Sequence, residues 1–335
     1  MAVLTHQQAE QYFGLRSMDP MRDLGGVADL IEEAFAQDLD RAGQNALQEL
    51  RWLSRLKPIL WWMMYTNPEH TDFLSGFVWE EDRKIVGNIT VNRTKINSRR
   101  WLISNLAVSK DYRGRGIARS LMDAGLELVR ECNGASVALQ VRADNEPAKQ
   151  LYCSLHFNEI SGTSYLWAER VPPVEIAAIP HSLVLRPRNP SAYDMREAYT
   201  LASAATLPLA QREWPLRQSQ FRLSGGESVT NFVRTFLGIG QPIHWVVEDG
   251  QRFVAMINVI PGKWRRTHKI ELIVHPDWRG YLEKPLISRA LFYLRSWRNR
   301  MISVKHPAEH TEALEAYQEL GLHEKQTLLW LKREM

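Results

Sequence analysis

The residues best suited to chemistry lie in a short loop rich in glycine and arginine. Gly114 and Gly116 alternate with basic side chains at Arg113, Arg115 and Arg119. An apolar stretch precedes the loop and an amphipathic one follows it, so we expect a strand to enter and a helix to begin near Gly116. The first turn of a helix presents unpartnered backbone N–H groups and a positive dipole end, which suit an anion. The loop therefore predicts a phosphate-binding site.

Two common nucleotide-binding motifs do not fit this loop. A Rossmann fingerprint requires a third glycine where this chain has Arg119. The P-loop pattern G-x-x-x-x-G-K-[ST] is absent from the sequence. A tight strand-to-helix turn with solvated arginines is the alternative that involves no ligand.

The pattern Arg113-x-x-Gly116-x-Ala118 resembles the [QR]-x-x-G-x-[GA] signature of the GNAT acyltransferase superfamily. Two flanking blocks resemble the same family. They are Leu106-Ala107-Val108, similar to its L-x-V segment, and Asn145, Ala148, Leu151-Tyr152 and Leu155-His156-Phe157, similar to its N-x-x-A-x-x-L-Y-x-x-x-G-F block. His156 stands where the family usually has glycine, and we expect this departure to be tolerated. The resemblance covers residues 14–168 and, in degenerate form, residues 183–334.

The resemblance implies acetyl-CoA as co-substrate and names the residues that bind it. In that family the loop N–H groups hold the pyrophosphate, while the preceding strand end binds the pantetheine arm and polarises the thioester carbonyl. The implied cofactor-binding residues are Leu106, Ala107, Val108, Arg113, Gly114, Arg115, Gly116, Ile117, Ala118, Arg119 and Asn145. Tyr152 matches the tyrosine that donates a proton to the departing thiolate, which suits a phenol with a pKa of about 10. The alternative for Tyr152 is a core aromatic side chain.

The general base is not assigned by the sequence. Family members often carry an acidic residue on the strand before the loop, but this strand has Ser104 and Asn105. A water relay, Glu80 or Glu81 are the alternatives. Cys153 has no histidine or aspartate at an interpretable spacing, so we interpret it as a structural thiol and not as a nucleophile.

Alternating helices and strands must position these residues. We expect helices over 27–36 and 45–56, strands near 73–80, 84–92 and 101–108, a helix from 116 to 132, a strand over 136–141, a helix over 148–155, and strands over 157–161 and 163–168. This order predicts an α/β domain whose sheet is mixed (α+β) and not wholly parallel.

Three segments of the first half recur in the second half. Leu15–Pro20 resembles Leu185–Pro190, Val108–Gly114 resembles Val274–Gly280, and Ala148–Leu155 resembles Ala313–Leu320. The offsets of 170, 166 and 165 residues are nearly constant, which indicates an internal duplication. We therefore expect two tandem GNAT-like acyltransferase domains, over 1–170 and 181–335, joined by a proline-containing linker over 171–180.

The second copy departs from the first at its loop. Leu282 and Lys284 replace Gly116 and Ala118, and Glu283 adds negative charge where a phosphate would bind. We expect this copy to keep the fold, to have lost the cofactor, and to take the place of a dimer partner. The chain is then a monomer with pseudo-dimeric halves or a homodimer.

Composition argues against a nucleic-acid-binding, a membrane-spanning and a zinc-binding protein. The net charge of +4, from 42 basic and 38 acidic residues, argues weakly for a polyanionic partner, so we interpret the basic clusters at 263–266 and 295–300 as solvated surface and not as a nucleic-acid site. The longest apolar run, 59–65, is too short to cross a bilayer, and two cysteines cannot form a four-ligand zinc site. We expect a cytoplasmic protein with no membrane segment, signal peptide or metal.

The sequence thus favours an acetyl-CoA-dependent N-acetyltransferase acting on a primary amine of a small molecule or peptide. The aromatic run 59–65 is a candidate wall of the acceptor pocket, with core packing as its alternative. Because no acidic base is evident, a non-catalytic acyl-CoA-binding sensor remains the alternative function.

Overall fold

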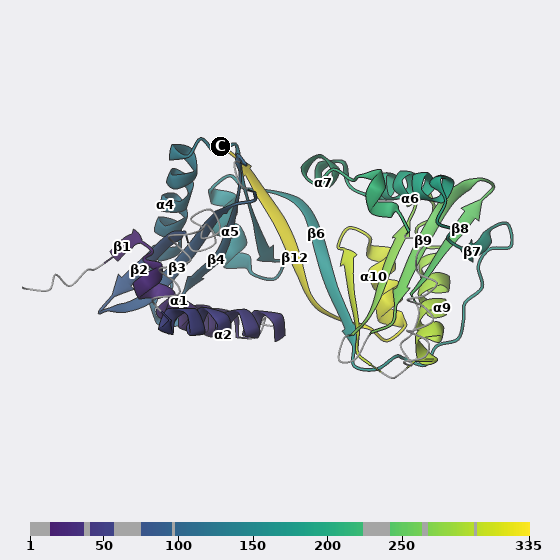
Figure 1. Ribbon diagram of the computed structural model, residues 1–335, viewed down its shortest axis with the longest axis horizontal. Coiled ribbons are helices and arrows are strands. Elements are labelled where there is room, and N and C mark those ends of the chain that lie inside the picture. Colours follow the sequence, from purple (N-terminus) through teal and green to yellow (C-terminus); the bar gives the residue numbers. More distant parts are fainter. Residues whose placement is uncertain are drawn as a thin grey trace, which may run out of the picture. The chain divides into compact units, whose positions relative to one another are not determined.

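The computed structural model describes residues 14–36, 41–56, 75–95, 98–223, 242–262, 267–297 and 300–335. They form two compact α/β units (Figure 1). Unit 1 takes its residues from 1–140, 147–158 and 331–335, and unit 2 from 141–146 and 159–330. In the part of the chain described, no helix is long and apolar enough to cross a membrane.

Unit 1 is built on a mixed sheet. Its strands follow the order β1 (Gly14–Ser17), β2 (Gly76–Glu81), β3 (Lys84–Arg93), β4 (Arg100–Val108) and β5 (Ser136–Arg142), and its helices are α1 (Pro20–Phe35), α2 (Arg41–Arg55), α4 (Ile117–Glu131) and α5 (Glu146–Ser154), with a short 3₁₀ turn η3 (Lys110–Tyr112). Strands β1 to β4 pair antiparallel, and β4 pairs with β5 in parallel. The mixed sheet predicted from the sequence is therefore confirmed.

The first helix begins earlier than the sequence pattern predicts. Asp19 caps α1 by accepting the Met21 N–H at 2.9 Å, and Pro20 occupies the first helical position, where a missing N–H costs nothing. The helix predicted over 27–36 is therefore wrong at its start, because its first turn faces a polar cluster and carries no apolar periodicity. The second predicted helix, over 45–56, corresponds to α2.

Helix α4 packs closely against the sheet, on the face opposite α1 (Figure 1). A Cβ atom at Gly87 of β3 would meet Ile117 at 2.9 Å and Leu121 at 3.0 Å. A Cβ atom at Gly125 would meet Val91 at 3.1 Å. The two glycines therefore allow α4 to pack close to β3. This close packing fixes the N-terminus of α4 beside the end of β4.

Unit 2 repeats the element order of the first half. Its elements are β6 (Asn158–Ala168), β7 (Val184–Pro187), α6 (Ala192–Ala205), α7 (Pro208–Glu213), the 3₁₀ turn η4 (Gln218–Phe221), β8 (Ile243–Asp249), β9 (Arg252–Ile260), β10 (His268–Val274), the 3₁₀ turn η5 (Pro276–Trp278), α9 (Glu283–Arg295), β11 (Ile302–Pro307), α10 (Thr311–Glu319) and β12 (His323–Glu334). The strands lie in the order β12-β6-β11-β10-β9-β8-β7. As in unit 1, one pair near the middle, β10 with β11, is parallel.

The two strands predicted over 157–161 and 163–168 are one continuous strand, β6, so the predicted break between them is wrong. A Cβ atom at Gly162 would meet the Ala308 Cβ at 2.7 Å, and the Gly162 carbonyl accepts the Ala308 N–H at 3.1 Å. This glycine therefore serves a close approach between segments and not a change of chain direction.

The compact units exchange segments between the two sequence repeats. Strand β6 follows the last helix of the first repeat but pairs antiparallel with β11 in unit 2. In return, residues 331–335 belong to unit 1, where the Met335 N–H donates to Ala135 O at 3.1 Å and the Arg333 guanidinium donates to Leu155 O at 2.9 Å.

Residues 171–180 contain neither helix nor strand. Val171, Val174 and Ile179 nevertheless pack against the hydrophobic core of unit 2, and the Ala177 N–H donates to Ser288 Oγ at 3.1 Å. This segment is therefore held along the surface of unit 2.

Candidate active site

The glycine-rich loop joins β4 to α4 and leaves open space at both glycines. Gly114 and Gly116 have φ of 76° and 79°, in the left-handed region that strongly favours glycine. A Cβ atom added at either position would meet no heavy atom within 4 Å. An incoming group can therefore approach the backbone closely at both positions.

The backbone N–H groups of residues 114–119 are also available to an incoming group. Within the described part of the chain, none of these six groups donates a hydrogen bond, and the first to do so is Ser120, to Gly116 O at 3.1 Å. No side chain caps the start of α4. Unpaired N–H groups at the positive end of a 15-residue helix form an anion-binding site. The loop therefore fits the pyrophosphate of a nucleotide cofactor.

The three arginines surround this loop with positive charge, and all are exposed. Arg113 Nε donates to Val108 O at 3.2 Å. Arg115 donates to Asp111 O at 3.2 Å and lies 3.7 Å from the Glu81 carboxylate. Arg113 and Arg115 donate only to backbone carbonyl groups, so both guanidinium groups can turn toward an anion at little cost.

The end of β4 separates from β5. Parallel pairing joins Arg100–Ile103 to Ser136–Leu139 only, although β4 continues to Val108. Asn105, with φ of 52°, marks the irregular position in β4. Ala107 and Val108 pair with β3 on their other side. The residues expected to bind the pantetheine arm, Leu106, Ala107 and Val108, thus lie beyond the last β5 pair, where strand backbone can bind an extended ligand.

Tyr152 lies in α5 of unit 1, 6% exposed, with its ring centroid 6.0 Å from that of Phe157. Burial raises the pKa of Tyr152 to about 12, so its hydroxyl stays protonated at neutral pH. Its helix is tied to the loop helix, because Arg119 donates to Ser154 Oγ at 2.5 Å. Asn145 lies in the turn before α5, is exposed, and belongs to unit 2.

Of the two base candidates, Glu80 is unsuited to the task. It is 2% exposed and forms ion pairs with Arg16 at 2.8 Å and Arg22 at 2.5 Å. Both of its carboxylate oxygens are engaged by arginines, so neither is open to an incoming amine. Glu81 is half-buried beside Arg115. Cys153 is a free, exposed thiol.

Sequence reasoning missed Glu33, which supports the loop from α1. Its carboxylate accepts the Ser109 hydroxyl at 3.0 Å and the Lys110 N–H at 3.2 Å. The hydrogen bond from Lys110 is the largest cause of a lowered pKa for Glu33. No local pattern links residues 76 positions apart, so only the folded chain reveals this contact.

The matching loop of unit 2 is closed by its own side chains. Gly280 keeps the left-handed φ, at 84°, but Leu282 is fully buried. The Glu283 carboxylate accepts the Leu282 N–H at 3.1 Å and contacts His310 Nε2 at 2.8 Å, and His310 in turn contacts His306 at 2.9 Å. A buried carboxylate therefore occupies the start of α9, where a phosphate would need to bind.

Some predicted features lie outside the described residues. These are the aromatic run 59–65, the basic cluster 263–266, and residues 298–299 of the second basic cluster. Within the described ranges, no group of three or more histidine, cysteine, aspartate or glutamate side chains could hold a metal ion.

Comparisons with known proteins agree with this geometry. The acetyltransferase (GNAT) family matches residues 33–157. Mycothiol acetyltransferase from Corynebacterium aurimucosum is 28% identical over 136 residues, 39% of this chain and 39% of that protein. N-alpha-acetyltransferase 30 from Schizosaccharomyces pombe is 38% identical over 58 residues, 17% of this chain and 39% of that protein. The matched part thus spans less than half of either relative.

One solved structure extends the likeness over the whole chain. A GCN5-related N-acetyltransferase from Sphaerobacter thermophilus superposes with a TM-score of 0.56 and 17% identity, covering 96% of this chain and 95% of that one. At this identity the likeness concerns the fold alone. The predicted fold class, a mixed α/β chain with GNAT-like architecture, is confirmed.

Proposed function

We propose that this chain, whose residues 33–157 match the acetyltransferase (GNAT) family, is an acetyl-CoA-dependent N-acetyltransferase whose working site lies in unit 1. The acceptor is a primary amine of a small molecule or peptide. The observation that carries the proposal is the row of free N–H groups over 114–119, beside a strand end that β5 leaves unpaired.

Each implied residue has a role that its surroundings support. Bound acetyl-CoA supplies the acetyl group as a thioester. The N–H groups of residues 114–119 hold its pyrophosphate, assisted by Arg113, Arg115 and Arg119. Leu106, Ala107 and Val108 offer backbone groups to the extended arm, and Asn145 is a further candidate contact. A backbone N–H aimed at the thioester oxygen stabilises the charge that develops there.

Tyr152 is the proposed general acid. Because burial raises its pKa to about 12, it holds its proton throughout the neutral range and can donate it to a departing thiolate. The contact between Arg119 and Ser154 keeps its helix beside the phosphate loop. The base that deprotonates the amine is Glu81 or a bound water.

Binding is tested by calorimetric titration of acetyl-CoA into the full chain. One site per chain is expected. Gly116→Leu copies the residue of unit 2 and should abolish binding, because it fills the open space at a left-handed position. Tyr281→Ala, at the exposed position of unit 2 that matches Arg115, is the control and should bind normally. Two sites per chain, or one that survives Gly116→Leu in a folded variant, would refute the assignment to unit 1.

Turnover is tested by free-thiol release from acetyl-CoA across a panel of amines. Tyr152→Phe should lower kcat on the order of 100-fold with little change in acetyl-CoA affinity. Tyr317→Phe is the matched control, because Tyr317 is the buried counterpart in unit 2 and its hydroxyl has no partner in the described structure. Equal loss in both variants would point to packing and contradict the role of the acid.

A non-catalytic acyl-CoA sensor is the second candidate. Two observations favour the sensor. Arginines engage the Glu80 carboxylate, and β4 carries Ser104 and Asn105 where family members often have an acidic residue. This candidate predicts acetyl-CoA binding at one site with thiol release at background for every amine. Amine-dependent release above background eliminates it.

A further inference from the structure

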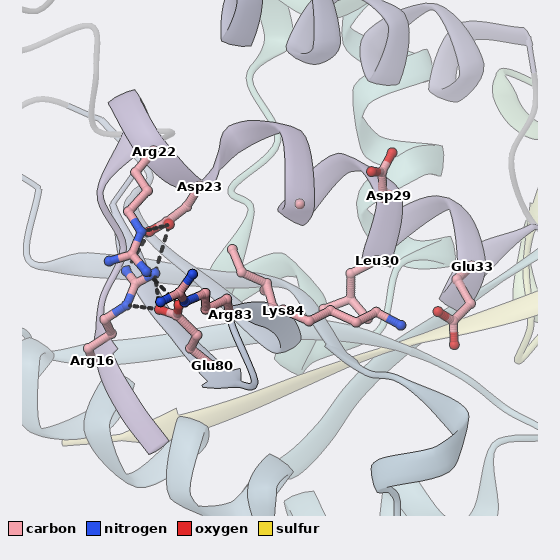
Figure 2. A pocket seen from close by; sticks show the side chains of 11 residues that line it. Arg16, Arg22, Asp23, Asp29, Leu30, Glu33, Glu80, Arg83 and Lys84 are labelled. Atoms are coloured by element: carbon pink, nitrogen blue, oxygen red, sulfur yellow. Dashed lines mark hydrogen bonds and ion pairs between the residues drawn. The ribbon is translucent and has the colours of Figure 1, made fainter. Parts of the chain in front are cut away.

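Unit 1 contains a cavity of about 420 Å³ that the proposed chemistry does not use. It lies between α1 and the turn that joins β2 to β3, and Figure 2 shows the charged side chains around it. Leu30 and Ile85 supply an apolar wall, and Gly26 lets Ile85 pack closely against α1, because a Cβ atom there would lie 3.2 Å from Ile85. The volume falls within the range of small-molecule sites.

The acidic side chains of this cavity are already engaged. Asp23 and Glu80 pair with Arg16 at 2.6 and 2.8 Å. Glu33 accepts hydrogen bonds from residues 109 and 110, as described above. Asp29 pairs with Arg51 at 2.7 Å.

Two cations at the same cavity are not engaged. Arg83 and Lys84 line it, and neither side chain forms an ion pair or hydrogen bond with a described residue. Lys84 extends along the cavity toward Glu33 (Figure 2) and helps, after the hydrogen bond from Lys110, to lower the pKa of that carboxyl. The charged groups of the cavity without a partner among the described residues are therefore the cationic side chains of Arg83 and Lys84. A cavity with such cations favours an anionic ligand.

Unit 2 contains the same ion-pair cluster, with Gln251 at the position of Arg83 and Arg252 at the position of Lys84. Arg186 pairs with Asp194 at 2.9 Å and with Glu248 at 2.7 Å, as Arg16 does with its two carboxylates. The Asn189 N–H donates to Asp194 at 2.6 Å, as the Asp19 N–H donates to Asp23 at 2.7 Å. The cluster is therefore a shared structural feature that joins the first strand, first helix and second strand of each repeat.

The residue before the shared aspartate distinguishes the two units. In unit 2 it is Tyr193, which donates to Gln251 O in the β8–β9 turn and stacks on Phe253 with ring centroids 6.2 Å apart. In unit 1 it is Arg22, which turns to Glu80 and borders the cavity. The Tyr193 side chain thus bridges helix and turn in unit 2, where Arg22 borders the cavity in unit 1.

We propose that this cavity binds a small anionic metabolite through a carboxylate or phosphate group held by Arg83 and Lys84. Its aliphatic part lies against Leu30 and Ile85. The site is coupled to the phosphate loop, because Glu33 both lines the cavity and holds the residues that end β4. The ligand is therefore a candidate effector of acetyl-CoA binding and not a part of the acetyl-CoA site.

The test is titration of the full chain with inorganic phosphate and with citrate, each with saturating acetyl-CoA present. We expect at least one probe to bind once per chain. Binding of phosphate alone identifies a phosphorylated ligand, and binding of citrate alone a carboxylate. Lys84→Ala should weaken binding on the order of tenfold by removing a charge-assisted contact. Arg252→Ala, at the matching first position of β9, is the control and should not change it.

A second variant tests the comparison between units. Arg22→Tyr copies Tyr193 into unit 1 and should abolish binding of the probe while acetyl-CoA still binds. Amide hydrogen exchange of residues 109–116 should slow when the probe occupies the wild type. The proposal is overturned if neither probe binds, if binding is unchanged in folded Lys84→Ala, or if acetyl-CoA displaces the probe, because the cavity would then belong to the cofactor.

Discussion

The residue after α5 offers a test of backbone strain with a built-in reference. His156 has φ of 61°, and Gly321, at the matching position after α10, has φ of 89°. In both repeats the N–H of the next residue returns to the tyrosine carbonyl five positions back, at 3.0 Å in unit 1 and 2.9 Å in unit 2. The two helices therefore end in the same way, but only one of them uses glycine.

The change in unfolding free energy expected for His156→Gly is the sum of two opposing contributions. A left-handed conformation costs an L-residue about 1–2 kcal/mol, which His156→Gly removes. Glycine loses about 0.5–1 kcal/mol more conformational entropy on folding. His156 is exposed, and its side chain makes no hydrogen bond to a described residue, so few contacts are lost. The net expectation is a stabilisation of about 0.5–1 kcal/mol, or a rise in Tm of about 1–4 °C for a unit of this size.

The assay is calorimetric thermal unfolding of the full chain with each variant. Gly321→His is the reverse control and should lower Tm, because it adds the strain and places a Cβ atom 3.2 Å from Pro172. If His156→Gly lowered Tm, or if Gly321→His left it unchanged, left-handed strain would not be what distinguishes these positions.

Two further predictions concern buried charge. Arg16→Ala should destabilise unit 1 by about 3 kcal/mol in urea unfolding, because Asp23 and Glu80 stay buried without their main partner; Arg22→Ala, with a side chain 55% exposed, should cost much less, and equal effects would contradict this. Burial, followed by the nearby His310 and Arg279, lowers the pKa of His306 to about 3 from 6.5, so the unfolded chain binds its proton first and stability falls as pH drops from 6.5 toward 3. Thermal unfolding across that range checks this, with His306→Phe expected to flatten the slope; an equal slope in that variant would assign the effect to another group.

Local sequence patterns predicted most of the candidate site around the glycine-rich loop of unit 1. They predicted few of the contacts that support that loop. Gly114 and Gly116 are visible in the sequence because a left-handed turn before a helix strongly favours glycine. The strand break predicted at residue 162 is wrong because a glycine inside a strand also permits close packing of a neighbouring segment. The loop contacts of Glu33 and the Arg16 ion pairs join residues far apart in the chain, and no periodicity encodes them.

The second copy illustrates the same limit. From the sequence, Leu282 indicated that the loop had changed and Glu283 that negative charge stood where a phosphate would bind. The structure buries Leu282 and brings Glu283 to the helix start, held by His310. A histidine 27 positions away decides where that carboxylate lies, so the mechanism of closure could be found only after folding.

The exchange of segments between the repeats has a consequence for synthesis. Unit 1 includes residues 331–335, so a ribosome must translate beyond residue 330 before unit 1 has all the residues assigned to it. Unit 2, by contrast, receives β6 before any of its own repeat has been made. A stop codon before residue 331, or a split between residues 170 and 181, would remove residues 331–335 from unit 1. Each unit therefore needs residues from both sequence repeats before it can fold completely.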